Sequence, residues 1–138
     1  MSEYKAFIDT SAILRLLTKD DESKSKAVGK LIKESGNKGI TLYLLPVTVL
    51  EIVWVLEKVY KFDRRTIREI VEATLNTPQL KCYLENVFRK ALLAYETQNI
   101  KFADAVMGYW GIEEGISTVY TYDEKDFRKI EGLNVMRP

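Results

Sequence analysis

A chain of 138 residues with 46% hydrophobic residues is long enough for one compact domain with a buried core. Its 21 basic and 20 acidic residues leave a formal net charge of +1, which excludes a strong overall field that would draw the protein to nucleic acid or membrane. The absence of histidine excludes Ser-His-Asp, Cys-His and histidine acid–base mechanisms, and with one cysteine it also argues against a tetrahedral zinc site.

Short apolar runs alternate along the chain with segments in which apolar residues recur at helical spacing. The runs predict strands at 4–8, 41–45, 80–83, 117–120 and 133–135. The helical spacing predicts helices at 11–17, 23–34, 46–60, 63–75, 85–97, 102–114 and 124–130. Strands that alternate with helices predict an α/β fold whose parallel sheet is covered on both faces.

The chain gives no sign of export or of a membrane span. Cys82 cannot form an intrachain disulfide, which fits a reducing compartment. Met1–Asp9 lacks the long apolar core of a signal peptide, and the most apolar stretch, 42–56, is too short to span a bilayer. We therefore expect a soluble cytoplasmic protein without a membrane partner.

Four acidic residues interrupt apolar segments: Asp9, Glu51, Asp104 and Asp123. A carboxylate held against apolar surface is costly, and four carboxylates brought together repel one another. A bound divalent cation relieves both costs, and carboxylates select hard cations such as Mg²⁺ or Mn²⁺. Asp9 and Asp123 follow predicted strands, so they belong at the carboxyl edge of the sheet, where ligands bind. The pattern therefore indicates metal-dependent chemistry.

Each acid also has a purely structural explanation. Asp9 and Asp123 could cap the helices that follow them, and Asp104 could complement the positive end of its own helix. Glu51 lies inside a predicted helix among Val47, Trp54 and Val55, so its structural alternative is a buried ion pair with Lys or Arg.

Four motifs, at 7–14, 49–56, 102–105 and 121–127, resemble the ordered acidic motifs of PIN-domain ribonucleases, and more narrowly those of VapC-type toxins. The resemblance runs from Phe7 to Val135. It implies a three-layer α/β/α PIN-like fold for a single domain, 1–138, with a central parallel sheet of about four to five strands flanked by helices. It further implies an Mg²⁺- or Mn²⁺-dependent endoribonuclease that is the toxin of a toxin–antitoxin pair, forms a homodimer and is neutralised by a small antitoxin.

The resemblance also assigns roles to residues. It makes four residues the catalytic and metal-binding carboxylates: Asp9, Glu51, Asp104 and Asp123. The positions that support this site are Thr10, Ser11, Thr121 and Asp126. Because Asp123 and Asp126 occur in the same motif, either could be the fourth ligand.

Two kinds of surface are candidates for contact with RNA or a partner. The basic residues that could follow an RNA backbone are Arg15, Lys19, Lys61, Arg64, Arg65, Lys101, Lys125 and Arg128. Most of the apolar residues in helices 11–17 and 46–60 are expected in the core, and the rest could form a groove for an antitoxin helix.

Three other classes compete with a ribonuclease. A haloacid-dehalogenase-like phosphatase would need a second Asp at position 11, where this chain has Ser11. A phosphoacceptor receiver domain would need an Asp after a middle strand, and Leu80–Leu84 contains none. A catalytically silent PIN-like module that binds RNA or protein would have no reason to keep four costly acids.

Overall fold

The computed structural model describes residues 4–138, which form two compact units. Unit 1 comprises the chain up to Phe62 together with Glu69–Tyr83. Unit 2 comprises Asp63–Arg68 and Leu84–Pro138.

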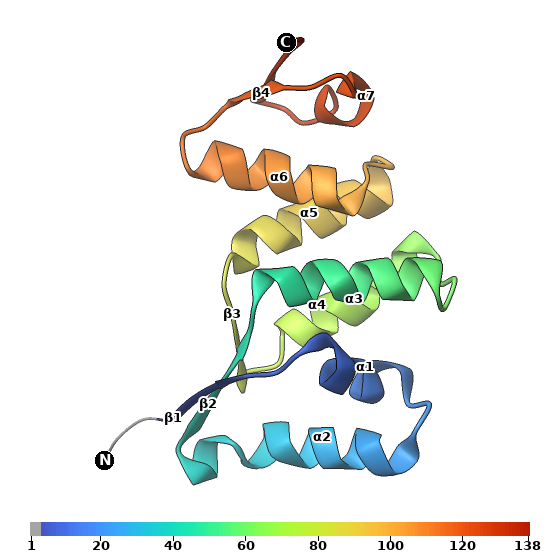
Figure 1. Ribbon diagram of the computed structural model, residues 1–138, viewed down its shortest axis with the longest axis vertical. Helices are drawn as coiled ribbons and strands as arrows, with labels where there is room; N and C mark the ends of the chain where they lie inside the picture. Colours follow the sequence, from blue (N-terminus) through green and yellow to red (C-terminus); the bar gives the residue numbers. More distant parts are fainter. Residues whose placement is uncertain (1–3) are drawn as a thin grey trace. The chain divides into compact units, whose positions relative to one another are not determined.

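Unit 1 is built on a parallel sheet in the order β1-β2-β3. Its strands are β1 (Tyr4–Phe7), β2 (Ile40–Leu44) and β3 (Leu80–Cys82). Ala6 pairs with Leu42, and Leu42 pairs in turn with Leu80. The helices joining these strands are α1 (Thr10–Thr18), α2 (Glu22–Glu34), η1 (Gly36–Lys38), α3 (Pro46–Lys58) and α4 (Arg64–Leu75). The start of α4, up to Arg68, belongs to unit 2. Helices α1 and α2 pack side by side, as Figure 1 shows.

The helix starts of unit 1 follow from local chemistry. The side chain of Asp21 accepts a hydrogen bond of 3.0 Å from the Lys24 amide and so caps α2. Pro46 opens α3 at a position where its missing N–H costs nothing, because the first amides of a helix have no partner within it. Five residues of α3 are buried: Thr48, Val49, Ile52, Val53 and Leu56.

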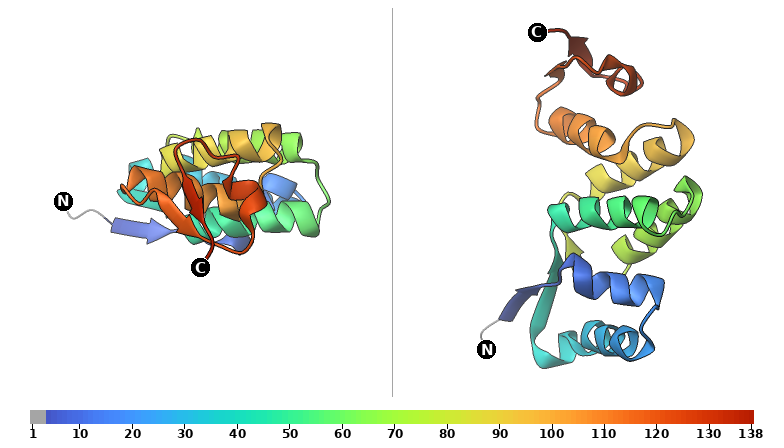
Figure 2. Two further views of the ribbon diagram at one scale, coloured as in Figure 1. Left: turned by 90° about the horizontal axis from the view of Figure 1, so that it is seen from above. Right: turned by 45° about the vertical axis from the view of Figure 1, so that its right-hand side comes forward.

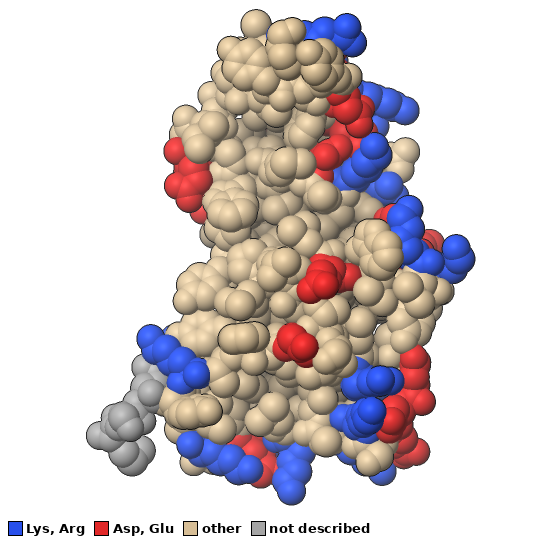
Figure 3. Space-filling view, viewed as in Figure 1, with Lys and Arg blue, Asp and Glu red and all other residues tan. Residues whose placement is uncertain are grey.

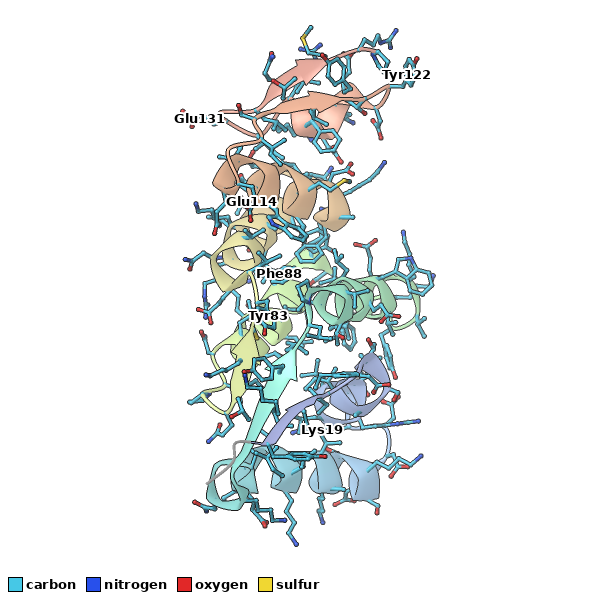
Figure 4. All side chains as sticks on the ribbon, turned by 60° about the vertical axis from the view of Figure 1, so that its left-hand side comes forward. Lys19, Tyr83, Phe88, Glu114, Tyr122 and Glu131 are labelled. Atoms are coloured by element: carbon cyan, nitrogen blue, oxygen red, sulfur yellow. The ribbon has the colours of Figure 1, made fainter. Side chains whose placement is uncertain are left out.

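Unit 2 is centred on α5 (Glu85–Thr97) and α6 (Phe102–Glu113), which lie side by side in both views of Figure 2. Phe88, labelled in Figure 4, stacks on Phe102 with ring centroids 6.2 Å apart, and Tyr95 meets the same ring edge-on at 5.9 Å. The unit ends in β4 (Thr118–Tyr120), α7 (Glu124–Phe127) and β5 (Asn134–Met136), and β4 and β5 pair in parallel.

The α/β class and the parallel direction of the strands are confirmed, but the strands do not form one central sheet of four to five. In the described chain they divide into a three-stranded and a two-stranded sheet, with β4 bonded to β5. The predicted elements all form, with boundaries that differ by no more than three residues, and α5 matches at both ends. Which strands become neighbours depends on contacts between distant segments, and a local apolar run carries no information about them.

Candidate active site

Asp9 ends the segment that follows β1 and caps α1. Its Oδ1 accepts hydrogen bonds of 2.8 Å from the Ser11 hydroxyl and 3.1 Å from the Ala12 amide. The Ser11 hydroxyl, followed by the Ala12 amide, holds the pKa of Asp9 below its ordinary value. The capping alternative is therefore correct for Asp9, and the carboxylate stays ionised at neutral pH. Both of these bonds go to Oδ1, so a ligand that approached Oδ2 would not have to break either of them.

Glu51 is exposed, so the expectation that apolar neighbours bury it is wrong. Val47 and Trp54, on the same side of α3, are also 60% and 59% exposed. The apolar residues of α3 extend around more than one face, and the face that carries Glu51 is not the one turned to the core. Instead of a buried ion pair, Glu51 accepts a hydrogen bond of 2.9 Å from the Thr10 hydroxyl. Thr10 and Ser11 therefore orient Glu51 and Asp9 within unit 1.

Asp104 and Asp123 both belong to unit 2. Asp104 lies in the first turn of α6 and is half-buried. Burial, and after it the negative charge of Asp126, raises the pKa of Asp104 above its ordinary value. Asp123 is exposed and accepts a hydrogen bond of 3.3 Å from the Lys101 ammonium. The bond to Asp123 also raises the pKa of Lys101.

The turn before α7 is held by Thr121. The Asp123 amide donates a hydrogen bond of 2.9 Å to the Thr121 hydroxyl, and that hydroxyl lies 3.2 Å from the Asp123 carbonyl oxygen. Asp123 precedes α7 but makes no side-chain cap, so the capping alternative is wrong for this residue. The Asp123 carboxylate therefore contacts the Lys101 ammonium and is otherwise exposed to solvent.

Asp126 is the most buried of the five acids, at 7% exposure. Its Oδ2 accepts a hydrogen bond of 2.9 Å from the Lys101 amide, the residue immediately before α6. Its Oδ1 lies 3.8 Å from the Lys129 ammonium. Sequence reasoning missed Lys129, although a lysine three residues after an acid in a helical segment was the available signal.

The donor chemistry of these residues suits a hard divalent cation, since carboxylates and hydroxyls supply only oxygen. In residues 4–138, no three Asp, Glu, Cys or His side chains are arranged in a geometry that could hold a metal ion. Asp9 and Glu51 belong to unit 1, whereas Asp104, Asp123 and Asp126 belong to unit 2. Metal binding by the four acids therefore stays a prediction.

Several basic residues proposed for an RNA track have structural partners. The Arg64 guanidinium donates to the Tyr95 and Ile100 carbonyl oxygens at 2.7 and 2.9 Å and lies 4.2 Å from the centre of the Tyr95 ring. Arg128 pairs with Glu124 at 2.8 Å. On the face shown in Figure 3, acidic and basic side chains lie among one another and form no continuous basic stripe.

The apolar residues proposed for a partner surface are partly core. Ile13, Val53 and Leu56 are buried, whereas Trp54 and Val59 are 59% and 62% exposed. A groove of about 390 Å³ also lies along β1, with Ala6, Ile8, Leu31 and Leu42 among its apolar walls and Asp9 at its lining. Unit 1 therefore offers apolar surface directly beside one of the candidate acids.

Comparison with known proteins identifies a family and proteins to which this chain is similar. Residues 6–133 match the family described as PIN domain. A protein of Aquifex aeolicus (strain VF5) named VapC ribonuclease is 28% identical over 131 residues, which cover 95% of each chain. A solved structure, described as VapBC2 from Rickettsia felis bound to a DNA fragment from their promoter, aligns with 97% of this chain and 98% of that chain, at 15% identity and a TM-score of 0.40.

Proposed function

Since this chain belongs to the PIN domain family, we propose that it is an Mg²⁺- or Mn²⁺-dependent endoribonuclease that hydrolyses RNA phosphodiester bonds. The proposal depends chiefly on the start of α1, where consecutive hydroxyl residues bind two of the acids. Ser11 donates to Asp9, and Thr10 donates to Glu51, 41 residues further along the chain. The relative named VapC ribonuclease supports the same activity.

In this proposal Asp9, Asp104 and Asp123 would hold the metal, and Glu51 would assist them or orient the attacking water. When bound, the ion supplies an activated water and positive charge at the scissile phosphate. The chain keeps Asp9 ionised through Ser11 and Ala12, and it fixes the rotamer of Glu51 through Thr10. Lys101 balances part of the charge of Asp123 before RNA, itself an anion, approaches.

We further propose that the protein is the toxin of a toxin–antitoxin pair, forms a homodimer and acts in the cytoplasm. The apolar groove along β1 suits an apolar antitoxin segment, and its position next to Asp9 would let an antitoxin arginine reach that carboxylate. Trp54 on α3 and Val59, directly after the helix, are both exposed and are candidate dimer contacts. In the part of the chain that the structure describes, no helix has the length and apolar character needed to cross a membrane.

Cleavage of labelled structured and single-stranded RNAs by the purified protein tests the activity. Each RNA is incubated with Mn²⁺ or Mg²⁺, with EDTA, and with an Asp9→Asn variant that controls for contaminating nuclease. Cutting that requires metal and disappears in Asp9→Asn is the expected result. Cutting that is unchanged in the variant would contradict the proposal, and absence of cutting with retained RNA binding would favour the catalytically silent module.

A further inference from the structure

A pocket of about 440 Å³ lies between α5 and α6, and none of the five acids described above lines it. Each helix contributes three residues, spaced so that the second and third follow the first by three and four positions: Asn86, Arg89, Lys90, Tyr109, Ile112 and Glu113. Residues at this spacing share one face of a helix, so two helix faces form the walls. Both helices belong to unit 2, and the pocket is complete within that unit.

The charges of the pocket suit a ligand with a single negative charge. Arg89 and Lys90 are positive and Glu113 is negative. The Arg89 Nε donates to Glu85 at 3.2 Å, which offsets part of the guanidinium charge and leaves the exposed Lys90 as the main attraction for an anion. The positive end of α5 adds to this attraction, because these residues lie in its first turns. A phosphodiester, with one negative charge, fits this modest positive potential.

The remaining walls suit a nucleobase. Tyr109 is half-buried and Ile112 lies one turn further along α6, so together they present an aromatic and apolar surface. Bases of any sequence stack on such a ring. The Asn86 amide both donates and accepts hydrogen bonds, whereas the Glu113 carboxylate only accepts. A base with an exocyclic amine, such as cytosine, offers Glu113 a donor, and uracil has no such amine.

We propose that this pocket binds one nucleotide of a single-stranded RNA, with the base against Tyr109 and the phosphate at Lys90, and that it prefers cytosine to uracil. This rests on the proposed ribonuclease function, because the RNA bound here would be its substrate. The pocket is formed by the last turns of α6, whereas Asp104 lies in the first turn. Binding at the pocket can therefore be measured without metal and without cleavage.

Fluorescence anisotropy of labelled oligo(C) and oligo(U), recorded with the purified protein in EDTA, tests the stacking contact. The wild type should bind oligo(C) about tenfold more tightly than oligo(U). Tyr109→Ala should weaken the binding of both RNAs by about tenfold, whereas Tyr109→Phe keeps the ring and should stay within about twofold of the wild type. Absence of RNA binding by the wild type, or equal binding by a Tyr109→Ala protein that circular dichroism shows to be folded, would overturn the inference.

The phosphate contact is tested by the dependence of affinity on salt. Lys90→Gln should lower the slope of log affinity against log salt concentration by about 0.7, the value for one phosphate contact on a single strand. Lys26→Gln is the matched control, since it removes an exposed lysine from α2 in unit 1 and should leave the slope unchanged. Equal slopes for the two variants would show that binding follows overall charge, and would overturn the inference.

The base contact is tested by Glu113→Gln, whose amide can donate to uracil as well as accept from cytosine. The preference for oligo(C) should fall from about tenfold to within about threefold, and an unchanged preference would contradict the assigned role of Glu113. Cytidine 5′-monophosphate that displaced oligo(C) at an equal concentration would make a free nucleotide the ligand, and the RNA inference would be wrong.

Failure of this inference is distinguishable from failure of the ribonuclease proposal. RNA binding that the pocket variants weaken, in a protein that cleaves no RNA with Mn²⁺ or Mg²⁺, would support the pocket and count against the ribonuclease alone. Metal-dependent cleavage with the same KM in the wild type, Tyr109→Ala and Lys90→Gln would support the ribonuclease and overturn the pocket.

Discussion

The Thr10 hydroxyl donates a hydrogen bond of 2.9 Å to Glu51, joining the first residue of α1 to the middle of α3. Thr10→Val removes the hydroxyl and keeps the shape of the side chain. Glu51 is exposed and would be solvated, so the free energy of unfolding should fall by no more than about 1 kcal/mol. The loss of orientation should lower kcat/KM for RNA cleavage by about tenfold.

Thr10→Ser is the matched control for this prediction, because serine retains the donor. It should keep cleavage close to that of the wild type. Equal cleavage by Thr10→Val and wild-type protein would show that cleavage does not depend on the orientation that this bond gives Glu51. A double-mutant cycle with Glu51→Gln would measure how strongly the two side chains are coupled.

A second prediction concerns the pKa of Asp9, which the Ser11 hydroxyl lowers first and the Ala12 amide second. Ser11→Ala should move this pKa up toward its ordinary value, measured by carboxyl ¹³C NMR titration. A lowered pKa stabilises the folded state above the ordinary pKa, and this contribution is lost as pH falls through the folded value. Ser11→Ala should therefore show a smaller loss of stability on acidification than the wild type.

The control here is Ser11→Thr, which keeps a hydroxyl at the same position. Its Asp9 pKa should stay close to that of the wild type. A pKa that does not change in Ser11→Ala would mean that the backbone amides of Ser11 and Ala12 account for the lowering without the hydroxyl.

The elements of this fold were predictable because their signals are local. Pro46 begins α3 where expected, and the Gly36–Gly39 segment separates α2 from β2. Asp9 caps α1, as the structural interpretation of this residue predicts. In each case a few neighbouring residues determine the backbone geometry, so the sequence alone contains the information.

The environment of the acids was less predictable because it depends on tertiary contacts. Apolar residues surround Glu51 in sequence, yet α3 is apolar on more than one side, and periodicity could not tell which side faces the core. The bond from the Lys101 amide to Asp126 joins residues 25 positions apart, and no local sequence pattern predicts it. The pairing of β4 with β5 also joins segments that are not adjacent in the sequence, so no local pattern predicts it.

A third prediction separates stability from activity at Asp104. Burial and the charge of Asp126 raise its pKa, so the ionised form is disfavoured by folding. A raised carboxyl pKa stabilises the folded state below the ordinary pKa, and this contribution is lost as pH rises through the folded value. Asp104→Asn should therefore unfold at a higher temperature than the wild type near neutral pH, and the difference should shrink in mild acid.

The same substitution should lower metal-dependent RNA cleavage by at least about 100-fold, since a ligand charge is lost. Thermal unfolding followed by circular dichroism, beside the cleavage assay, measures both effects on one protein sample. A variant that is less stable than the wild type at neutral pH would contradict the charge argument. A variant that cleaves RNA normally would remove Asp104 from the site.

The last prediction is independent of activity and concerns the end of α6. A Cβ added at Gly111 would lie 2.8 Å from the carbonyl oxygen of Ile116, and the Ile116 amide donates back to the Gly111 carbonyl oxygen at 2.7 Å. Backbone held in this way cannot move aside, so Gly111→Ala should lower the free energy of unfolding by about 1–3 kcal/mol. Gly36→Ala is the matched control, because no atom lies within 4 Å of its added Cβ, and it should change stability by no more than about 0.5 kcal/mol. Urea denaturation of the two variants measures the difference, and equal midpoints would show that the turn after α6 is looser than this close approach requires.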